Sequence, residues 1–138
     1  MKHKSIFVAC DTSNISQIKN IIKQTQTNKL KIFPKFGLQF FYSKNGRKFL
    51  ENFNKDFWLD LKINDIPQTA LSAVDSLKDL KKCKYITVHA NGGFEMLKAI
   101  KKKVKSINKN LKVLGVTILT SLNNKSLKEI GHTKSVEQ

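Results

Sequence analysis

Apolar residues gather in five short runs along the chain, and stretches of helical periodicity separate these runs. The runs, each rich in apolar or β-branched residues, cover 5–11, 30–37, 56–63, 84–90 and 111–120. Between them, apolar residues recur every three or four positions over 15–24, 70–80 and 97–107, and a shorter helix is expected over 45–53. This alternation predicts βα units whose strands form one parallel sheet.

A polar residue stands at or near the end of each predicted strand. The five are Asp11, Lys35, Asp60, His89 and Thr117, at intervals of 24, 25, 29 and 28 residues. In parallel α/β proteins, ligands bind at the carboxyl ends of the strands. These residues therefore indicate a binding or catalytic edge of the sheet.

Two parallel architectures fit five such units. A period of about 26 residues, repeated eight times, gives a (β/α)₈ barrel of roughly 200–250 residues. A complete doubly wound domain of the flavodoxin type needs only five strands, and the length of 138 residues favours it. The motifs described below favour the barrel. We therefore expect an incomplete (β/α)₈ TIM barrel, with residues 1–138 as the N-terminal part of a single barrel domain.

The formal net charge of +16 raises the possibility of a nucleic-acid partner. However, the chain has 25 lysines and a single arginine, Arg47, whereas phosphates and base edges are best recognised by the bidentate arginine fork. The abundance of Lys, Asn, Ile and Phe is typical of an A/T-rich coding sequence. In 97–107, the lysines are expected on the solvated face of an amphipathic helix whose apolar face holds Leu97, Ile100, Val104 and Ile107.

Cysteine usage and hydropathy indicate a cytoplasmic protein. Cys10 and Cys83 show no metal-ligand spacing and are expected to be core thiols in a reduced compartment. No apolar stretch approaches the roughly 20 residues that cross a bilayer. The apolar run near the N-terminus is too short for a signal peptide. We expect no membrane association and no metal site.

The segment DFWLDLKINDIPQT, residues 56–69, places charges in and after an apolar strand. Side chains two apart in a strand point to the same face, so Asp60 and Lys62 are expected to project together, with Trp58 on the same side. Asp65 begins the following loop, and Thr69 lies near the start of the next helix. Buried salt bridges rarely stabilise a fold more than apolar residues would, so this cluster indicates function.

Residues 60–69, DLKINDIPQT, resemble the Asp-x-Lys-x-x-Asp-Ile-Pro-x-Thr signature of the orotidine 5′-phosphate decarboxylase family at every defining position. ACDTS, KFG, TVHANGG and VTILTSL agree with that family in order and spacing, from Phe7 to about Gly131. The shorter Asp-x-Lys-x-x-Asp core is shared with hexulose-phosphate synthases and keto-gulonate-phosphate decarboxylases. The extensions IPQT, HANGG and LTS favour the orotidylate branch, and the related phosphate-sugar enzymes remain an alternative.

The resemblance implies a cofactor-free decarboxylation of orotidine 5′-phosphate to UMP. Lys62 would stabilise and protonate the carbanion at C6, and Asp60 would lie beside the substrate carboxylate and hold Lys62. Asp65 and Thr69 would reach the partner's site across a homodimer interface. Asp11 and Lys35 would bind the ribose hydroxyls, and Thr120 the pyrimidine.

Other conspicuous residues receive lesser roles. His89 is expected to pack and hydrogen-bond at a strand end, and NGG (91–93) to form a turn into the next helix rather than a phosphate loop. Glu95 and Arg47 are expected to be solvated.

The family's phosphate-binding loop and late arginine have no counterpart in these 138 residues. We therefore expect the 138 residues alone to have little or no decarboxylase activity. A basic nucleic-acid-binding module and a non-catalytic five-stranded fold remain alternative hypotheses.

Overall fold

The computed structural model describes residues 5–136 and contains a five-stranded parallel sheet. Its strands are β1 (Ser5–Ala9), β2 (Lys31–Gly37), β3 (Phe57–Ile63), β4 (Cys83–His89) and β5 (Lys112–Val116). They pair in the order β1-β2-β3-β4-β5, so each strand lies beside its neighbours in sequence. A doubly wound sheet would reverse its strand order at a switch point. The prediction of barrel-type βα units is therefore confirmed, and the flavodoxin-type order is excluded.

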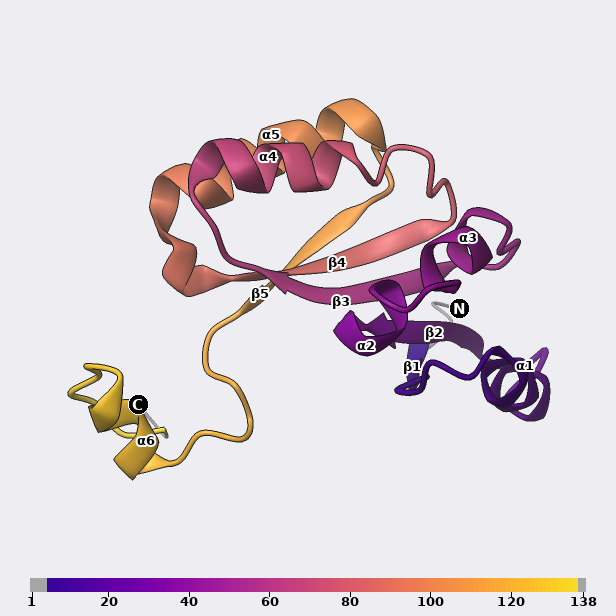
Figure 1. Ribbon diagram of the computed structural model, residues 1–138, viewed down its shortest axis with the longest axis horizontal. Helices are drawn as coiled ribbons and strands as arrows, with labels where there is room; N and C mark the ends of the chain where they lie inside the picture. The colour runs from indigo at the N-terminus through magenta and orange to yellow at the C-terminus, as the bar shows by residue number, and fades with distance from the viewer. Residues whose placement is uncertain (1–4, 137–138) are drawn as a thin grey trace.

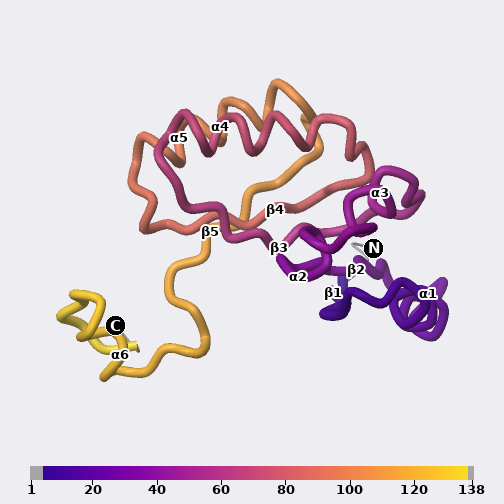
Figure 2. Tube along the Cα trace, in the orientation of Figure 1, coloured from indigo at the N-terminus to yellow at the C-terminus, as the bar shows by residue number. Residues whose placement is uncertain are grey.

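Helices connect the strands as the periodicity predicts; the ends predicted for 15–24 are observed, and each of the other three predicted helices has at least one shifted end. They are α1 (Ile15–Gln24), α2 (Leu38–Phe41), α3 (Gly46–Glu51), α4 (Pro67–Asp75), the 3₁₀ helix η1 (Ala90–Gly92), α5 (Gly93–Ile107) and α6 (Asn124–Glu129). Figure 1 shows α4 and α5 side by side over one face of the sheet, and α1, α2 and α3 near the β1–β2 side. The tube in Figure 2 follows the chain from β5 through a long connection to α6.

The predicted apolar faces of α1 and α5 pack on the sheet. In α1, the Asn14 side chain accepts hydrogen bonds from the backbone N–H groups of Ser16 and Gln17, which caps the helix. Ile18 is fully buried below it. In α5, Ile100 and Val104 are buried, while most of the helix's lysines are exposed. The interpretation of this lysine run as a solvated helix face is confirmed.

The two faces of the sheet differ in what covers them. On the helix-covered face, Phe36, Phe57, Leu59, Ile86 and Val88 are fully buried in the main core. On the opposite face, the rings of Phe7, Phe33, Trp58 and Tyr85 contact one another at centroid distances between 4.9 and 5.5 Å. The strand alternation predicts this division, and it puts the ring cluster on the same face as Asp60.

Candidate active site

Three strands bring four of the predicted site residues together at the carboxyl edge of the sheet. The Lys62 ammonium lies 2.8 Å from Asp60 Oδ2. The Lys35 ammonium lies 3.6 Å from the same oxygen and 3.1 Å from Asp11 Oδ1. Asp11, Lys35, Asp60 and Lys62 therefore form a continuous line of alternating charges, which the sequence placed correctly as a group.

A bulge in β3 sets the position of Lys62. Leu59 pairs with Ile86 and Ile63 with Val88, so three residues of β3 stand opposite the single residue Thr87 of β4. Within residues 5–136, Lys62 is the one non-glycine residue with a positive φ, at 51°. Bulges redirect side chains and often lie next to active sites, and backbone strain concentrates at functional positions.

Thr87 connects the bulge to the charged pair, and it is not among the site residues predicted from the sequence. Its side chain lies inside the molecule, and its hydroxyl accepts a hydrogen bond from the Lys62 backbone N–H at 2.9 Å. The same hydroxyl donates to Asp60 Oδ1 at 2.8 Å. The available signal was a threonine among the apolar residues of KYITVHA, two positions before His89.

Asp60 is held as a carboxylate although its side chain is only 13% exposed. Burial by itself raises the pKa of this carboxyl group. Hydrogen bonds from Lys62 and Thr87, together with the charges of Lys62 and Lys35, outweigh that effect and bring the pKa below the ordinary 3.8. The site therefore presents one fixed anion flanked by two cations at neutral pH.

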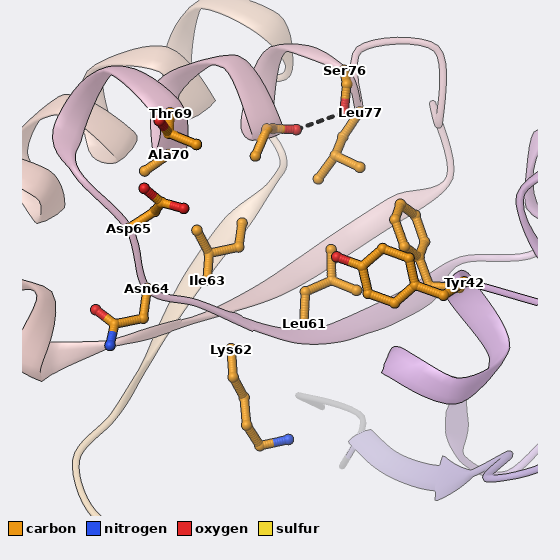
Figure 3. A pocket seen from close by; sticks show the side chains of 12 residues that line it. Tyr42, Leu61, Lys62, Ile63, Asn64, Asp65, Thr69, Ala70, Ser76 and Leu77 are labelled. Carbon is orange, nitrogen blue, oxygen red and sulfur yellow. Dashed lines mark hydrogen bonds between the residues drawn. The ribbon is translucent and has the colours of Figure 1, made fainter.

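Asp65 and Thr69 lie apart from this pair. Figure 3 shows Lys62 pointing away from β3 on one side, while Asp65 and Thr69 lie on the other side beside α4. Both are exposed, and they line a cavity of about 510 Å³ that is also lined by Tyr42, Leu61 and Lys62. Asp65 lies past the end of β3, on the loop toward α4, and no ion pair joins it to Lys62 among the described residues. Its expected role in a partner's site stays a prediction.

The end of β5 also differs from the prediction. The strand stops at Val116, which pairs with the last residue of β4, His89. Thr117 and Thr120 are exposed beyond it, on the connection that leaves the sheet toward α6 in Figure 1. The structure therefore does not bring Thr120 to the Asp60–Lys62 pair. The role of His89 stays a prediction.

Arg47 was expected to be solvated, but its side chain makes several hydrogen bonds within the fold. Its guanidinium donates to Glu51, to the Ser76 carbonyl and to Asp79. These contacts join α3 to the segment that follows α4, because one planar fork can serve several acceptors. Arg47 is thus a structural residue here. By contrast, Glu95 is exposed and 91–93 form the turn into α5, as expected.

Over residues 5–136, no group of three or more His, Cys, Asp or Glu side chains is arranged to hold a metal ion. None of the helices in that range is both long and apolar enough to cross a bilayer.

A barrel-type parallel sheet with charged groups gathered at the carboxyl ends of its strands defines the class of (β/α)-barrel proteins with a site at that face. Residues 4–138 match the sequence model of the Orotidine 5′-phosphate decarboxylase / HUMPS family. The chain belongs to this family.

Individual relatives agree with the family assignment. The chain is 33% identical to an orotidine 5′-phosphate decarboxylase of Carboxydothermus hydrogenoformans, over 96% of the chain and 57% of the relative. It is 35% identical to that of Malacoplasma penetrans, over 88% and 52%. The crystal structure of the Lactobacillus acidophilus enzyme superposes with a TM-score of 0.80 at 28% identity, over 96% and 61%. The chain thus spans about half the length of its curated relatives.

Proposed function

We propose that the protein decarboxylates orotidine 5′-phosphate to UMP, a step of pyrimidine nucleotide biosynthesis. The observation that carries this proposal is the Lys62 ammonium, 2.8 Å from the Asp60 carboxylate at the carboxyl edge of the sheet. Membership of the family and the names of the relatives support the choice of substrate.

Lys62 is the proposed catalytic acid. When the bond from C6 to the carboxylate breaks, CO₂ leaves and the electron pair stays on C6 of the pyrimidine. The ammonium stabilises this charge and then transfers a proton from Nζ to C6, and the resulting amine regains a proton from water. At about 4 Å and an effective dielectric constant of about 20, such a charge pair is worth roughly 4 kcal/mol, a substantial part of the ~8–23 kcal/mol by which enzymes lower barriers.

Asp60, Lys35 and Asp11 support this acid in the proposed site. Asp60 holds the Lys62 ammonium in place through their direct ion pair. It would also repel the substrate carboxylate until CO₂ leaves. Lys35, held between Asp11 and Asp60, is assigned with Asp11 to the ribose hydroxyls. The contact of Thr120 with the pyrimidine stays a prediction from the family signature.

Asp65 and Thr69 are proposed to act in the site of a partner subunit. Their separation from Lys62 within one chain, seen in Figure 3, is what such a role requires. Nearby apolar residues support an interface, since Tyr42 is 77% and Ile66 is 66% exposed. In a homodimer with two-fold symmetry, each subunit would complete the other's site.

The cytoplasm remains the proposed location. Cys10 and Cys83 are both free and buried, which is consistent with a reduced compartment.

The proposal is tested by measuring UMP formation. Because the chain spans about half of its relatives, the assay uses the 138 residues joined to the later strands of the Carboxydothermus hydrogenoformans relative, hereafter the extended chain. We expect the extended chain to form UMP, with the 138 residues alone showing little or no turnover. Lys62→Ala should abolish UMP formation, whereas Lys82→Ala, at an exposed lysine, should not change it.

The same assay separates the alternatives. Turnover of a hexulose phosphate but not of orotidine 5′-phosphate would move the protein to the other branch of the family. Salt-dependent nucleic-acid binding that is indifferent to Lys62→Ala would favour the basic binding module. A folded extended chain that forms no UMP would contradict the proposal.

The shared site has its own test in the extended chain. Lys62→Ala and Asp65→Ala should each be inactive, but mixing them allows heterodimers in which one site has both residues. Random pairing makes half of the dimers mixed, so about a quarter of wild-type activity should return. Failure of two folded, inactive variants to recover any activity on subunit exchange would contradict the cross-subunit role.

A further inference from the structure

Thr87 occupies an unusual place in the sheet. Among residues 5–136, it is the one polar residue within the buried core, at 2% exposed. It lies in the middle of β4, between the fully buried Ile86 and Val88. A valine has nearly the same shape and would fill the same space without the desolvation cost of a hydroxyl. The hydroxyl therefore needs an explanation beyond packing.

The hydrogen bonds of Thr87 use both abilities of its hydroxyl. It accepts from the Lys62 backbone N–H and donates to Asp60 Oδ1, at 2.9 and 2.8 Å. The other oxygen of Asp60 accepts from the Lys62 ammonium at 2.8 Å. Each oxygen of the carboxylate therefore has its own donor. One hydroxyl, one carboxylate and one lysine form a closed loop through the bulge.

This loop spans the strained part of β3. A side-chain-bearing residue with a φ of 51° adopts a left-handed conformation that is unfavourable by itself. Thr87 stands alone opposite the three bulge residues, and its hydroxyl holds the Lys62 backbone in that conformation. The direction in which the Lys62 side chain leaves the strand depends on this φ.

We propose that Thr87 is a positioning residue: its hydroxyl ties the bulge at Lys62 to the Asp60 carboxylate and so fixes the ammonium relative to the carboxylate. Thr87 touches the two catalytic groups and acts through them. Its effect on turnover rests on the function proposed above. Its effect on the two side chains does not depend on that function.

The variants that test this proposal are Thr87→Val, which removes the hydroxyl at nearly constant shape, and Thr87→Ser, which keeps it. Thr27→Val, at an exposed threonine between α1 and β2, is the control. In the 138-residue chain, ¹³C NMR follows the titration of the Asp60 carboxyl group, and amide exchange follows the Lys62 N–H. We expect Thr87→Val to raise the Asp60 pKa and to speed Lys62 exchange about tenfold. The serine and control variants should match the wild type.

Kinetics of the extended chain give the second measurement. Thr87→Val should lower kcat about tenfold to a hundredfold with KM nearly unchanged, and Thr87→Ser should recover most of it. A purely structural role predicts lost folded protein instead, with normal kcat per folded molecule.

Each outcome decides the question. A folded Thr87→Val variant with wild-type Asp60 pKa and Lys62 exchange overturns the proposal, as does unchanged kcat in an active extended chain. Should the valine variant not fold, a folded Thr87→Ser variant decides: an unshifted Asp60 pKa supports the proposal and a raised one overturns it. If the wild-type extended chain forms no UMP, the proposed function fails, while the NMR result still tests Thr87.

Discussion

Two aspartates at opposite ends of β3 have similar partners and different surroundings. Asp56, at the amino end, lies 3.6 Å from the ammonium groups of both Lys31 and Lys84. Asp60, at the carboxyl end, has Lys35 at 3.6 Å but Lys62 at 2.8 Å. The Asp56 side chain is 28% exposed and that of Asp60 is 13% exposed.

The difference lies in geometry, because each carboxylate has two lysines. The Asp56 distances exceed those of ordinary hydrogen bonds, whereas Asp60 accepts short bonds from a lysine and a buried threonine. A register shift also lies at each end of β3, between Phe57 and Trp58 and, with more extra residues, between Leu59 and Ile63; the positive φ of Lys62 lies at the carboxyl end. The amino end thus carries screened ion pairs worth little, and the carboxyl end carries an ordered charged site.

The largest expected difference is in turnover. In the extended chain, Asp60→Asn should lower kcat about tenfold to a hundredfold, because hydrogen bonds to charged groups are worth about 1.5–3 kcal/mol. Asp56→Asn should leave kcat unchanged, since it lies at the other end of β3. Steady-state UMP formation measures both, and equal effects of the two substitutions would remove the contrast.

A smaller difference is expected in stability. Asp60→Asn should destabilise the 138-residue chain by about 1–3 kcal/mol, because Lys62 and Thr87 lose a charged acceptor in a partly buried place. Asp56→Asn should cost no more than about 1 kcal/mol, as exposed ion pairs do. Urea unfolding of both variants measures these losses. A larger loss of stability in Asp56→Asn than in Asp60→Asn would contradict the prediction.

The difference in stability between a glycine and an alanine variant should have opposite signs at the bulge and in a regular strand. At Lys62, glycine should be more stable than alanine by about 1–2 kcal/mol, because alanine bears the cost of a φ of 51°. At Ile6, in the regularly paired strand β1, glycine should be less stable than alanine by about 0.5–1 kcal/mol. Thermal unfolding of the four variants checks this, and the same sign at both positions would argue against strain at Lys62.

The smallest expected effect is on acid stability. Since folding lowers the pKa of Asp60, its contribution is present above the ordinary value of 3.8 and is lost as the pH falls below it. Asp60→Asn should therefore reduce the loss of stability below about pH 4. Part of the loss should remain, because hydrogen bonds from Lys103 and Lys78 also lower the pKa of Asp75. Unfolding curves between pH 2 and 7 measure this. If Asp60 did not contribute to acid stability, the Asp60→Asn variant would show the same pH dependence as the wild type.

Local sequence patterns predicted the elements because burial sets their spacing. The helix 15–24 was predicted to the residue, since its isoleucines recur on one face and Asn14 caps it. The fifth strand was predicted too long because Ile118 and Leu119 continue its apolar run. Pairing ends at Val116, where β4 ends at His89. Apolar spacing does not reveal where a neighbouring strand stops.

The candidate site was predicted only in part, because sequence patterns do not reveal how neighbouring strands pair. Alternation placed Asp60 and Lys62 on one face, and the spacing of strand ends added Asp11 and Lys35. The bulge, which depends on the register of β3 against β4, has no signal in alternation. Thr87 was therefore missed. The position of Asp65 depends on the direction of a loop, which the motif spacing does not specify.

The most direct test of the central claim replaces Lys62 by cysteine in the extended chain and restores the ammonium chemically. Lys62→Cys should lower kcat at least about a thousandfold, the equivalent of a charge interaction of roughly 4 kcal/mol. Alkylation with 2-bromoethylamine rebuilds a lysine-like ammonium. Burial raises the pKa of Cys10 to about 11 and that of Cys83 to about 12, so these native thiols should stay unmodified. We predict that aminoethylation restores UMP formation and that neutral alkylation with iodoacetamide does not. Full turnover by unmodified Lys62→Cys, or equal recovery with the neutral reagent, would contradict the assignment of Lys62 as the catalytic acid.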